Sequence, residues 1–199
     1  MKTKINILLA GVGGQGTILV SDIISDAAIA SGYDVKKTDT IGMAQRGGSV
    51  ISNLIIGDKV WSPLIADGDA DLLIAFEKLE GARYGHFLKE NSIALINDYA
   101  IPPLSVNMGA GRYPTNDDML KTIRQRTKNV YLMHASERAR ELGDMRTFNV
   151  YMLGSMTHFL PVKEHIWSEC LSHKLPAKIL DINLESFNLG RKEIASYFK

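Results

Sequence analysis

A glycine-rich turn between an apolar run and a helical pattern is the feature that most constrains the fold of this chain. Residues 5–10 (Ile-Asn-Ile-Leu-Leu-Ala) are apolar at nearly every position, which is typical of a parallel strand covered on both faces. The next six residues, 11–16, read Gly-Val-Gly-Gly-Gln-Gly. Beyond them, apolar residues recur at helical spacing until Gly32, a residue type that commonly ends helices. This order predicts the start of a βαβ unit in an α/β fold.

Further apolar runs alternate with helical patterns along the rest of the chain. We expect the strand at 34–38 to run parallel to the strand at 5–10 and directly beside it, following the right-handed crossover rule. Other predicted strands are 49–56, 70–76, 92–97 and 130–133, with a short hairpin from the turn at 57–58 to 59–61. Predicted helices are 79–88, 115–127 (Thr115 as N-cap), 136–142, 147–159, 163–173 and 184–198. We therefore predict one α/β domain, residues 1–199, with a helical C-terminal third.

Composition and charge exclude several classes of function. Lys+Arg 23 against Asp+Glu 22 leaves a net charge of +1, which indicates neither a nucleic-acid-binding surface nor a polybasic membrane patch. The single cysteine, Cys170, excludes a disulfide framework, a four-cysteine zinc site and an internally ligated iron–sulfur cluster. The apolar run near the N-terminus is too short for a membrane span and leads into the glycine turn rather than a cleavage site. We expect an unprocessed, soluble, cytoplasmic protein.

The glycine turn is also the strongest candidate binding site. Gly11, Gly13 and Gly16 fit the pattern G-x-G-x-x-G between a strand and a helix, which lets backbone amides approach a phosphate or pyrophosphate. The alternative is that these glycines only permit a tight connection and bind no ligand. The residues predicted to contact a phosphate ligand are Gly11, Gly13, Gly14, Gln15, Gly16 and Thr17.

A nicotinamide dinucleotide at this turn would require an acidic residue near the end of the second strand. Asp39 is suitably placed, and Asp34 lies nearer the start of that strand. Lys36 and Lys37 lie close by and would equally suit an additional phosphate. The pattern leaves both possibilities open.

A second glycine-containing loop, residues 40–49, precedes the next predicted strand. Its residues Arg46, Gly47 and Gly48 can present a guanidinium group and exposed backbone to a carboxylate, a phosphate or a partner chain. The alternative is an ordinary turn with a solvated arginine. The five histidines lack metal-ligand spacing, and Cys170 has no evident activating base. We therefore predict no catalytic residue and no metal site on this chain.

Three segments, taken in order, resemble the gamma-type domain of the 2-oxoacid:ferredoxin oxidoreductases. They are residues 9–16 (Leu-Ala-Gly-Val-Gly-Gly-Gln-Gly), 45–49 (Gln-Arg-Gly-Gly-Ser) and 69–77 (Asp-Ala-Asp-Leu-Leu-Ile-Ala-Phe-Glu). Within this family the chain is most similar to the beta subunit of indolepyruvate ferredoxin oxidoreductases. The likeness covers residues 5–198 and is weakest after Gly143. It implies a three-layer Rossmann-like domain with a mostly parallel sheet.

The resemblance also implies a division of labour between subunits. Family members oxidatively decarboxylate a 2-oxoacid, acting on its oxo group, and pass the electrons to ferredoxin. Thiamine diphosphate and [4Fe–4S] clusters are then expected on a large partner subunit, since residues 68–70 (Gly-Asp-Ala) do not complete the Gly-Asp-Gly that opens a thiamine diphosphate motif. The glycine turn would contact coenzyme A, the 2-oxoacid would be indolepyruvate or another aryl-pyruvate, and the isolated chain would be inactive.

Three hypotheses about function follow. The first is an accessory subunit of such an enzyme, which exposes an apolar patch and is prone to self-association when its partner is absent. The second is an autonomous NAD(P)-dependent oxidoreductase, whose binding of NAD(P)H would be weakened by Asp39→Ala. The third is a non-redox module that binds a phosphate ligand.

Overall fold

The fold is built on one six-stranded sheet with the strand order β2-β3-β1-β4-β5-β6. The computed structural model describes residues 4–41 and 47–198. The strands are β1 (Ile5–Val12), β2 (Asp34–Ile41), β3 (Ser49–Gly57), β4 (Ala70–Ala75), β5 (Leu88–Asn97) and β6 (Asn129–Met133). The helices are α1 (Thr17–Ala30), α2 (Lys78–Tyr84), α3 (Leu104–Asn107), α4 (Asn116–Arg124), α5 (Ala135–Glu141), α6 (Phe148–Met156), α7 (Glu164–Lys174) and α8 (Ala177–Ser196).

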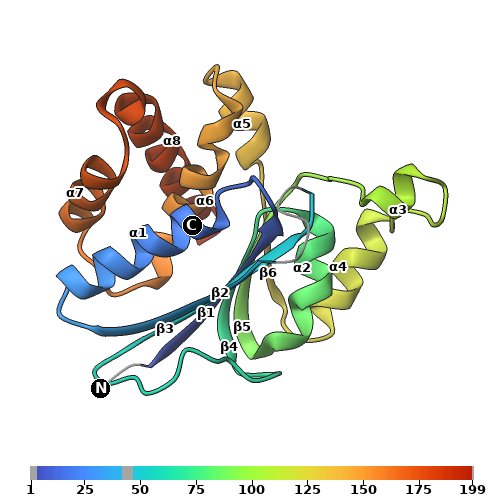
Figure 1. The fold of residues 1–199 in the computed structure, drawn as a ribbon, viewed down its shortest axis with the longest axis horizontal. Coiled ribbons are helices and arrows are strands. Elements are labelled where there is room, and N and C mark those ends of the chain that lie inside the picture. The colour runs from blue at the N-terminus through green and yellow to red at the C-terminus, as the bar shows by residue number, and fades with distance from the viewer. Residues whose placement is uncertain (1–3, 42–46, 199) are drawn as a thin grey trace.

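Helices cover the sheet on both faces, which makes three layers (Figure 1). The helices α1, α6, α7 and α8 lie on one side of the sheet, and α2 and α4 lie on the other. Successive side chains of β1 point to opposite faces, as the pleat of a strand requires. Thus Ile7 and Leu9 are buried among the first group of helices, whereas Leu8 and Ala10 belong to the core beneath the second group. The three-layer architecture and the helical C-terminal third are confirmed.

The sheet is mostly parallel, as predicted, but its strand order differs from the prediction. β1 pairs in parallel with β4, and β4, β5 and β6 continue in parallel. β3 pairs antiparallel with both β1 and β2, so it lies between them. The prediction that the strand at 34–38 lies directly beside the strand at 5–10 is therefore wrong.

The composition of the two strands explains this order. β2 reads Asp-Val-Lys-Lys-Thr-Asp-Thr-Ile and carries charged side chains suited to the edge of a sheet. β3 is buried at seven of its nine positions and therefore takes the inner place against β1. Its residues pair with β1 in a register that sets Ile7 opposite Leu54.

Several elements and boundaries differ from the sequence predictions. No hairpin forms at 59–61, because the described chain has no regular structure between β3 and β4. Instead the Val60 amide donates to the Asp34 carboxylate over 2.8 Å. α8 begins at Ala177, earlier than predicted, and the helix predicted to extend to Leu88 ends sooner because that residue begins β5. The short helix α3 was not predicted.

The C-terminal helices pack unusually closely through two glycines. A Cβ atom added at Gly154 of α6 would lie 2.1 Å from the Phe187 carbonyl oxygen of α8. A Cβ atom added at Gly190 would lie 2.0 Å from the Tyr151 carbonyl oxygen. Backbone therefore contacts backbone, and α6 is buried at every position. Within residues 4–41 and 47–198, no helix combines the length and apolar character that a membrane span requires.

Candidate functional site

The glycine turn lies at the carboxyl edge of the sheet, where β1 ends and α1 begins. Gly14 and Gly16 have φ of 101° and 82°, the left-handed region that favours glycine. Gly16 is the N-cap of α1 and supplies no side chain to bond the first-turn amides. Gly11 permits close packing, because a Cβ atom there would lie 2.8 Å from the Thr17 hydroxyl oxygen.

The amino end of α1 is a candidate anion site. In the part of the chain that the structure describes, the amides of Thr17, Ile18 and Leu19 have no hydrogen-bond acceptor. Such amides, together with the helix dipole, favour a phosphate or carboxylate. A pocket of about 460 Å³ opens beside them. Its walls are Val12, Gly13, Gly14, Gly16, Thr17, Ile18 and Val50.

Two of the predicted site residues turn their side chains into the protein. The Gln15 side chain accepts from the Val12 amide (2.7 Å) and donates to the Phe76 carbonyl oxygen (3.0 Å). The Thr17 hydroxyl oxygen is buried and has no hydrogen-bond partner among the described residues. In this conformation these two side chains support the turn from the protein interior.

The second predicted loop reaches the glycine turn. The Gly13 amide donates to the Gly48 carbonyl oxygen over 2.7 Å, and Gly47 has a φ of 77°. The next residue, Ser49, donates its hydroxyl to the Glu80 carboxylate and lies 2.9 Å from the Tyr84 hydroxyl. Arg46 lies outside the described residues. The structure therefore brings Gly47 and Gly48 to the predicted site.

Two buried carboxylates at the start of α2, the N-cap residue Glu77 and the helical residue Glu80, belong to this edge and were not singled out from the sequence. Glu77 caps α2 by accepting from the Glu80 amide (2.9 Å), and it also accepts from the Ile101 amide (3.0 Å) and the Tyr113 hydroxyl. Burial raises the pKa of Glu80, opposed by its bond to Ser49. Burial and the Glu77 carboxylate raise the pKa of Tyr113. The sequence signal that could have found Glu77 is its position, two residues after the end of the buried strand β4.

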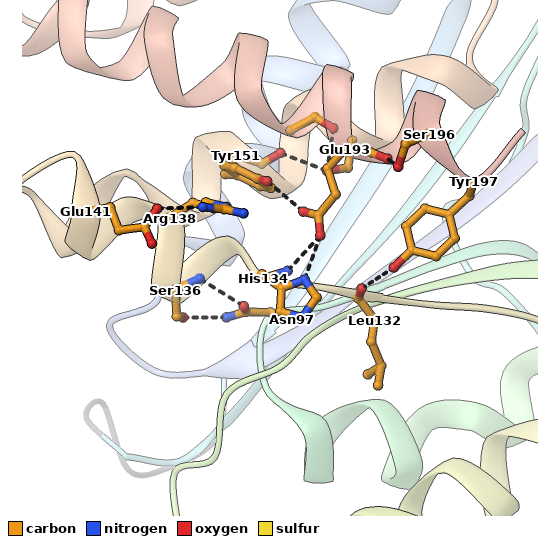
Figure 2. Close-up of polar contacts among 12 residues, drawn as sticks. Asn97, Leu132, His134, Ser136, Arg138, Glu141, Tyr151, Glu193, Ser196 and Tyr197 are labelled. Carbon is orange, nitrogen blue, oxygen red and sulfur yellow. Dashed lines mark hydrogen bonds and ion pairs between the residues drawn. The ribbon is translucent and has the colours of Figure 1, made fainter. Parts of the chain in front are cut away.

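A polar chain continues from the glycine turn along the edge of the sheet. The Phe76 carbonyl oxygen, which accepts from the Gln15 side chain, also accepts from the Asn97 side chain over 3.1 Å. Figure 2 shows that Asn97 in turn bonds Ser136: its Nδ2 donates to the hydroxyl (2.8 Å), and its Oδ1 accepts from the Ser136 amide (3.2 Å). The amino end of α5 is thereby tied to the end of β5.

A histidine–glutamate pair ends this edge of the sheet (Figure 2). His134 follows β6, and its Nδ1 lies 2.7 Å from the Glu193 carboxylate of α8. The same carboxylate accepts from the Tyr151 hydroxyl over 2.6 Å. The hydrogen bond to Glu193 raises the pKa of His134, with burial opposing it. The pair connects β6, α6 and α8, which are distant in sequence.

The acidic residue considered for a dinucleotide site is engaged elsewhere. Asp39 pairs with Lys37 (2.9 Å) and accepts from the Ser52 hydroxyl (2.6 Å). It lies on the edge strand β2, which β3 separates from β1. A ribose-binding acid in a dinucleotide fold follows the strand next to the glycine turn. Asp39 does not occupy that place, and Asp34 pairs with Lys36.

The described residues contain no cluster of three metal-binding side chains. Cys170 is partly buried on α7, and burial raises the pKa of its thiol, which disfavours the reactive thiolate.

Known proteins resemble this chain over almost its full length. The family of pyruvate ferredoxin/flavodoxin oxidoreductases matches residues 6–193. Indolepyruvate oxidoreductase subunit IorB of Archaeoglobus fulgidus is 38% identical over 196 residues, covering 97% of this chain and 96% of that protein.

Two solved structures share the fold. The gamma subunit of a keto/oxoacid ferredoxin oxidoreductase from Geobacter sulfurreducens PCA aligns with a TM-score of 0.73 at 21% identity and covers 98% of both chains. The 2-oxoglutarate:ferredoxin oxidoreductase from Magnetococcus marinus, solved with 2-oxoglutarate, coenzyme A and succinyl-CoA bound, aligns with a TM-score of 0.77 at 22% identity. That alignment covers 98% of this chain and 32% of the larger chain.

Proposed function

Because the chain belongs to the pyruvate ferredoxin/flavodoxin oxidoreductase family, we propose that it is the small, non-catalytic subunit of a 2-oxoacid:ferredoxin oxidoreductase. One observation carries the proposal: the chain aligns with 96% of a relative named as a subunit of indolepyruvate oxidoreductase, at 38% identity. An alignment that spans both chains almost end to end supports equivalence of whole subunits. The substrate proposed for the complex is accordingly indolepyruvate or another aryl-pyruvate.

The partner in this proposal is a large subunit that carries thiamine diphosphate and [4Fe–4S] clusters and passes electrons to ferredoxin. A [4Fe–4S] cluster takes four cysteine thiolates, and this chain has one cysteine. The isolated chain is therefore expected to be inactive. We place the complex in the cytoplasm, in keeping with the sparse use of cysteine.

The glycine turn is proposed to bind a phosphate group of coenzyme A. The residues fit such a group, because Thr17 and Ile18, whose amides have no acceptor among the described residues, line the pocket together with Gly13 and Gly14. A fold neighbour, the Magnetococcus marinus enzyme, has coenzyme A bound. The proposed ligand-contacting residues remain Gly11, Gly13, Gly14, Gln15, Gly16, Thr17, Arg46, Gly47 and Gly48, with Gln15 and Thr17 acting from beneath the turn.

Exposed apolar side chains support a role as a subunit. Trp61 is 81% exposed, Leu64 71%, Leu104 73% and Met108 74%. Contiguous apolar patches on a surface commonly mark protein interfaces, and each of the two short stretches 61–64 and 104–108 carries two of these side chains. They also account for an expected tendency of the isolated chain to self-associate.

An autonomous NAD(P)-dependent enzyme has less support. Its acidic ribose contact would be Asp39, which is held by Lys37 and Ser52 on the edge strand. The glycine turn suits the phosphates of either cofactor and so does not distinguish them.

The test is anaerobic affinity purification of the tagged full chain from its native cells, with mass spectrometry of the co-purifying proteins. We expect a brown complex with a large subunit that contains cluster cysteines and thiamine diphosphate. The complex should reduce ferredoxin with an aryl-pyruvate and coenzyme A, and the chain alone should not. A colourless chain with no such partner would contradict the proposal, and titration with NADH would then test the alternative.

A further inference from the structure

Helix α6 presents an amide side chain to the glycine turn. Asn149 lies in the first turn of α6. A Cβ atom added at Gly16 would lie 2.1 Å from Asn149 Nδ2. The carboxamide therefore occupies the space that any side chain at position 16 would need. It lies directly over the N-cap of α1, whose first-turn amides have no acceptor within residues 4–41 and 47–198.

The Asn149 side chain has no hydrogen-bond partner among the described residues, although only 8% of the residue is exposed. Its amide atoms are not among the side-chain atoms that are both buried from water and unbonded, so in the free chain they keep some contact with water. The other buried amides at this edge are bonded, since Gln15 bonds Val12 and Phe76, and Asn97 bonds Phe76 and Ser136. Asn149 is thus a polar side chain without a partner among the described residues, placed beside the N-cap of α1.

We propose that Asn149 is a ligand-contacting residue, whose Nδ2 donates a hydrogen bond to the phosphate group held by the amino end of α1. The proposal deepens the proposed function and rests on it. Backbone amides approach the phosphate from α1, and the carboxamide approaches from α6. The site then recognises a phosphate without any cationic side chain from the described part of the chain, and ligand binding supplies Asn149 with a partner that no described residue gives it.

The test combines variants of the full chain with a direct observation of the native protein. Binding of coenzyme A and, separately, of inorganic phosphate is measured by calorimetry for the native chain, Asn149→Ala and Asn149→Asp. Loss of one hydrogen bond to a charged group predicts a fall in affinity of about tenfold or more for Asn149→Ala. Asn149→Asp should bind still more weakly, because its carboxylate has nearly the same size but repels the phosphate. Asn188→Asp, on an exposed position of α8, adds the same charge elsewhere and should bind as the native chain does.

The native chain provides a readout that does not depend on any variant folding. The side-chain amide resonances of Asn149, assigned in a ¹⁵N-labelled sample, should shift on titration with coenzyme A or phosphate. A purely structural asparagine would not respond in this way. Thermal unfolding of each variant identifies any loss of binding that follows from loss of folding.

The experiments distinguish an error about Asn149 from an error about the phosphate site at the glycine turn. If native binding is abolished by Gly13→Trp but is unchanged in both Asn149 variants, and the Asn149 resonances do not shift, the role of Asn149 is overturned and the phosphate site stands. If the native chain binds neither probe, or Gly13→Trp binds as the native chain does, the phosphate site itself is overturned, and the role of Asn149 with it.

Discussion

The Gly13 amide donates to the Gly48 carbonyl oxygen over 2.7 Å, which joins the two loops that the sequence analysis singled out separately. One loop connects β1 to α1, and the other leads into β3. Because β3 pairs with β1, the two loops emerge from neighbouring strands at the same edge of the sheet. A change in either loop is therefore expected to alter the other.

Filling the glycine turn should block ligand binding. Gly13→Trp places a large side chain in the pocket of about 460 Å³ beside the α1 amides, so calorimetry should detect no binding of coenzyme A. Gly111→Trp is the control, because no atom lies within 4 Å of a Cβ atom at that position. Undiminished binding by Gly13→Trp would show that the ligand binds elsewhere.

Removing the buried charge of Glu80 should change how stability depends on pH. Burial raises the pKa of Glu80 above its ordinary value of 4.5, so the unfolded chain loses this proton first as the pH rises. The native chain therefore loses stability as the pH rises through 4.5 and on through the raised folded-state value. Relative to the native chain, Glu80→Gln should gain stability in urea unfolding as the pH rises from 4.5 through the raised folded-state pKa of Glu80. The control is Glu185→Gln, at an exposed position of α8, which should show no such gain in stability. If the free energies of unfolding of Glu80→Gln and the native chain differ by the same amount at every pH, the raised pKa of Glu80 is contradicted.

The Glu193 carboxylate should control the titration of His134. Its hydrogen bond raises the pKa of His134 above 6.5. The stabilisation is therefore complete below pH 6.5 and is lost as the pH rises through the folded-state value. In Glu193→Gln, the pKa of His134 should fall, which an NMR titration measures. The decrease in stability as the pH rises through that pKa should also become smaller, which urea unfolding measures. An unchanged His134 titration in that variant would refute the pairing.

The contact between α6 and α8 should not tolerate a single methyl group. In Gly190→Ala the new Cβ atom would meet the Tyr151 carbonyl oxygen at 2.0 Å, and backbone cannot move aside as a flexible side chain does. We expect a loss of about 3 kcal/mol or more in the free energy of unfolding. Gly111→Ala, in open space, should be neutral or slightly stabilising. Equal stability of the two variants would mean that the helices separate at little cost.

Much of the local structure could be predicted from the sequence. The apolar run 5–10, the glycine turn and the helix after it appear where expected, as β1 and α1. Thr115 caps α4 by accepting from the Asp118 amide. These features depend on residues a few positions apart, so spacing, capping and glycine conformation suffice to predict them. The residues that resemble the family likewise lie in short contiguous segments.

The strand order and the partners within the site were decided by the tertiary structure alone. β3 lies between β1 and β2 because the more apolar strand gains most from the inner position, a comparison that no local pattern expresses. Asn149 meets Gly16, and Glu193 meets His134, only after α6 and α8 pack against the sheet. A sequence pattern predicts which face of an element is buried. Which distant residue that face meets depends on close packing and long-range hydrogen bonds, which exist only once the chain has folded.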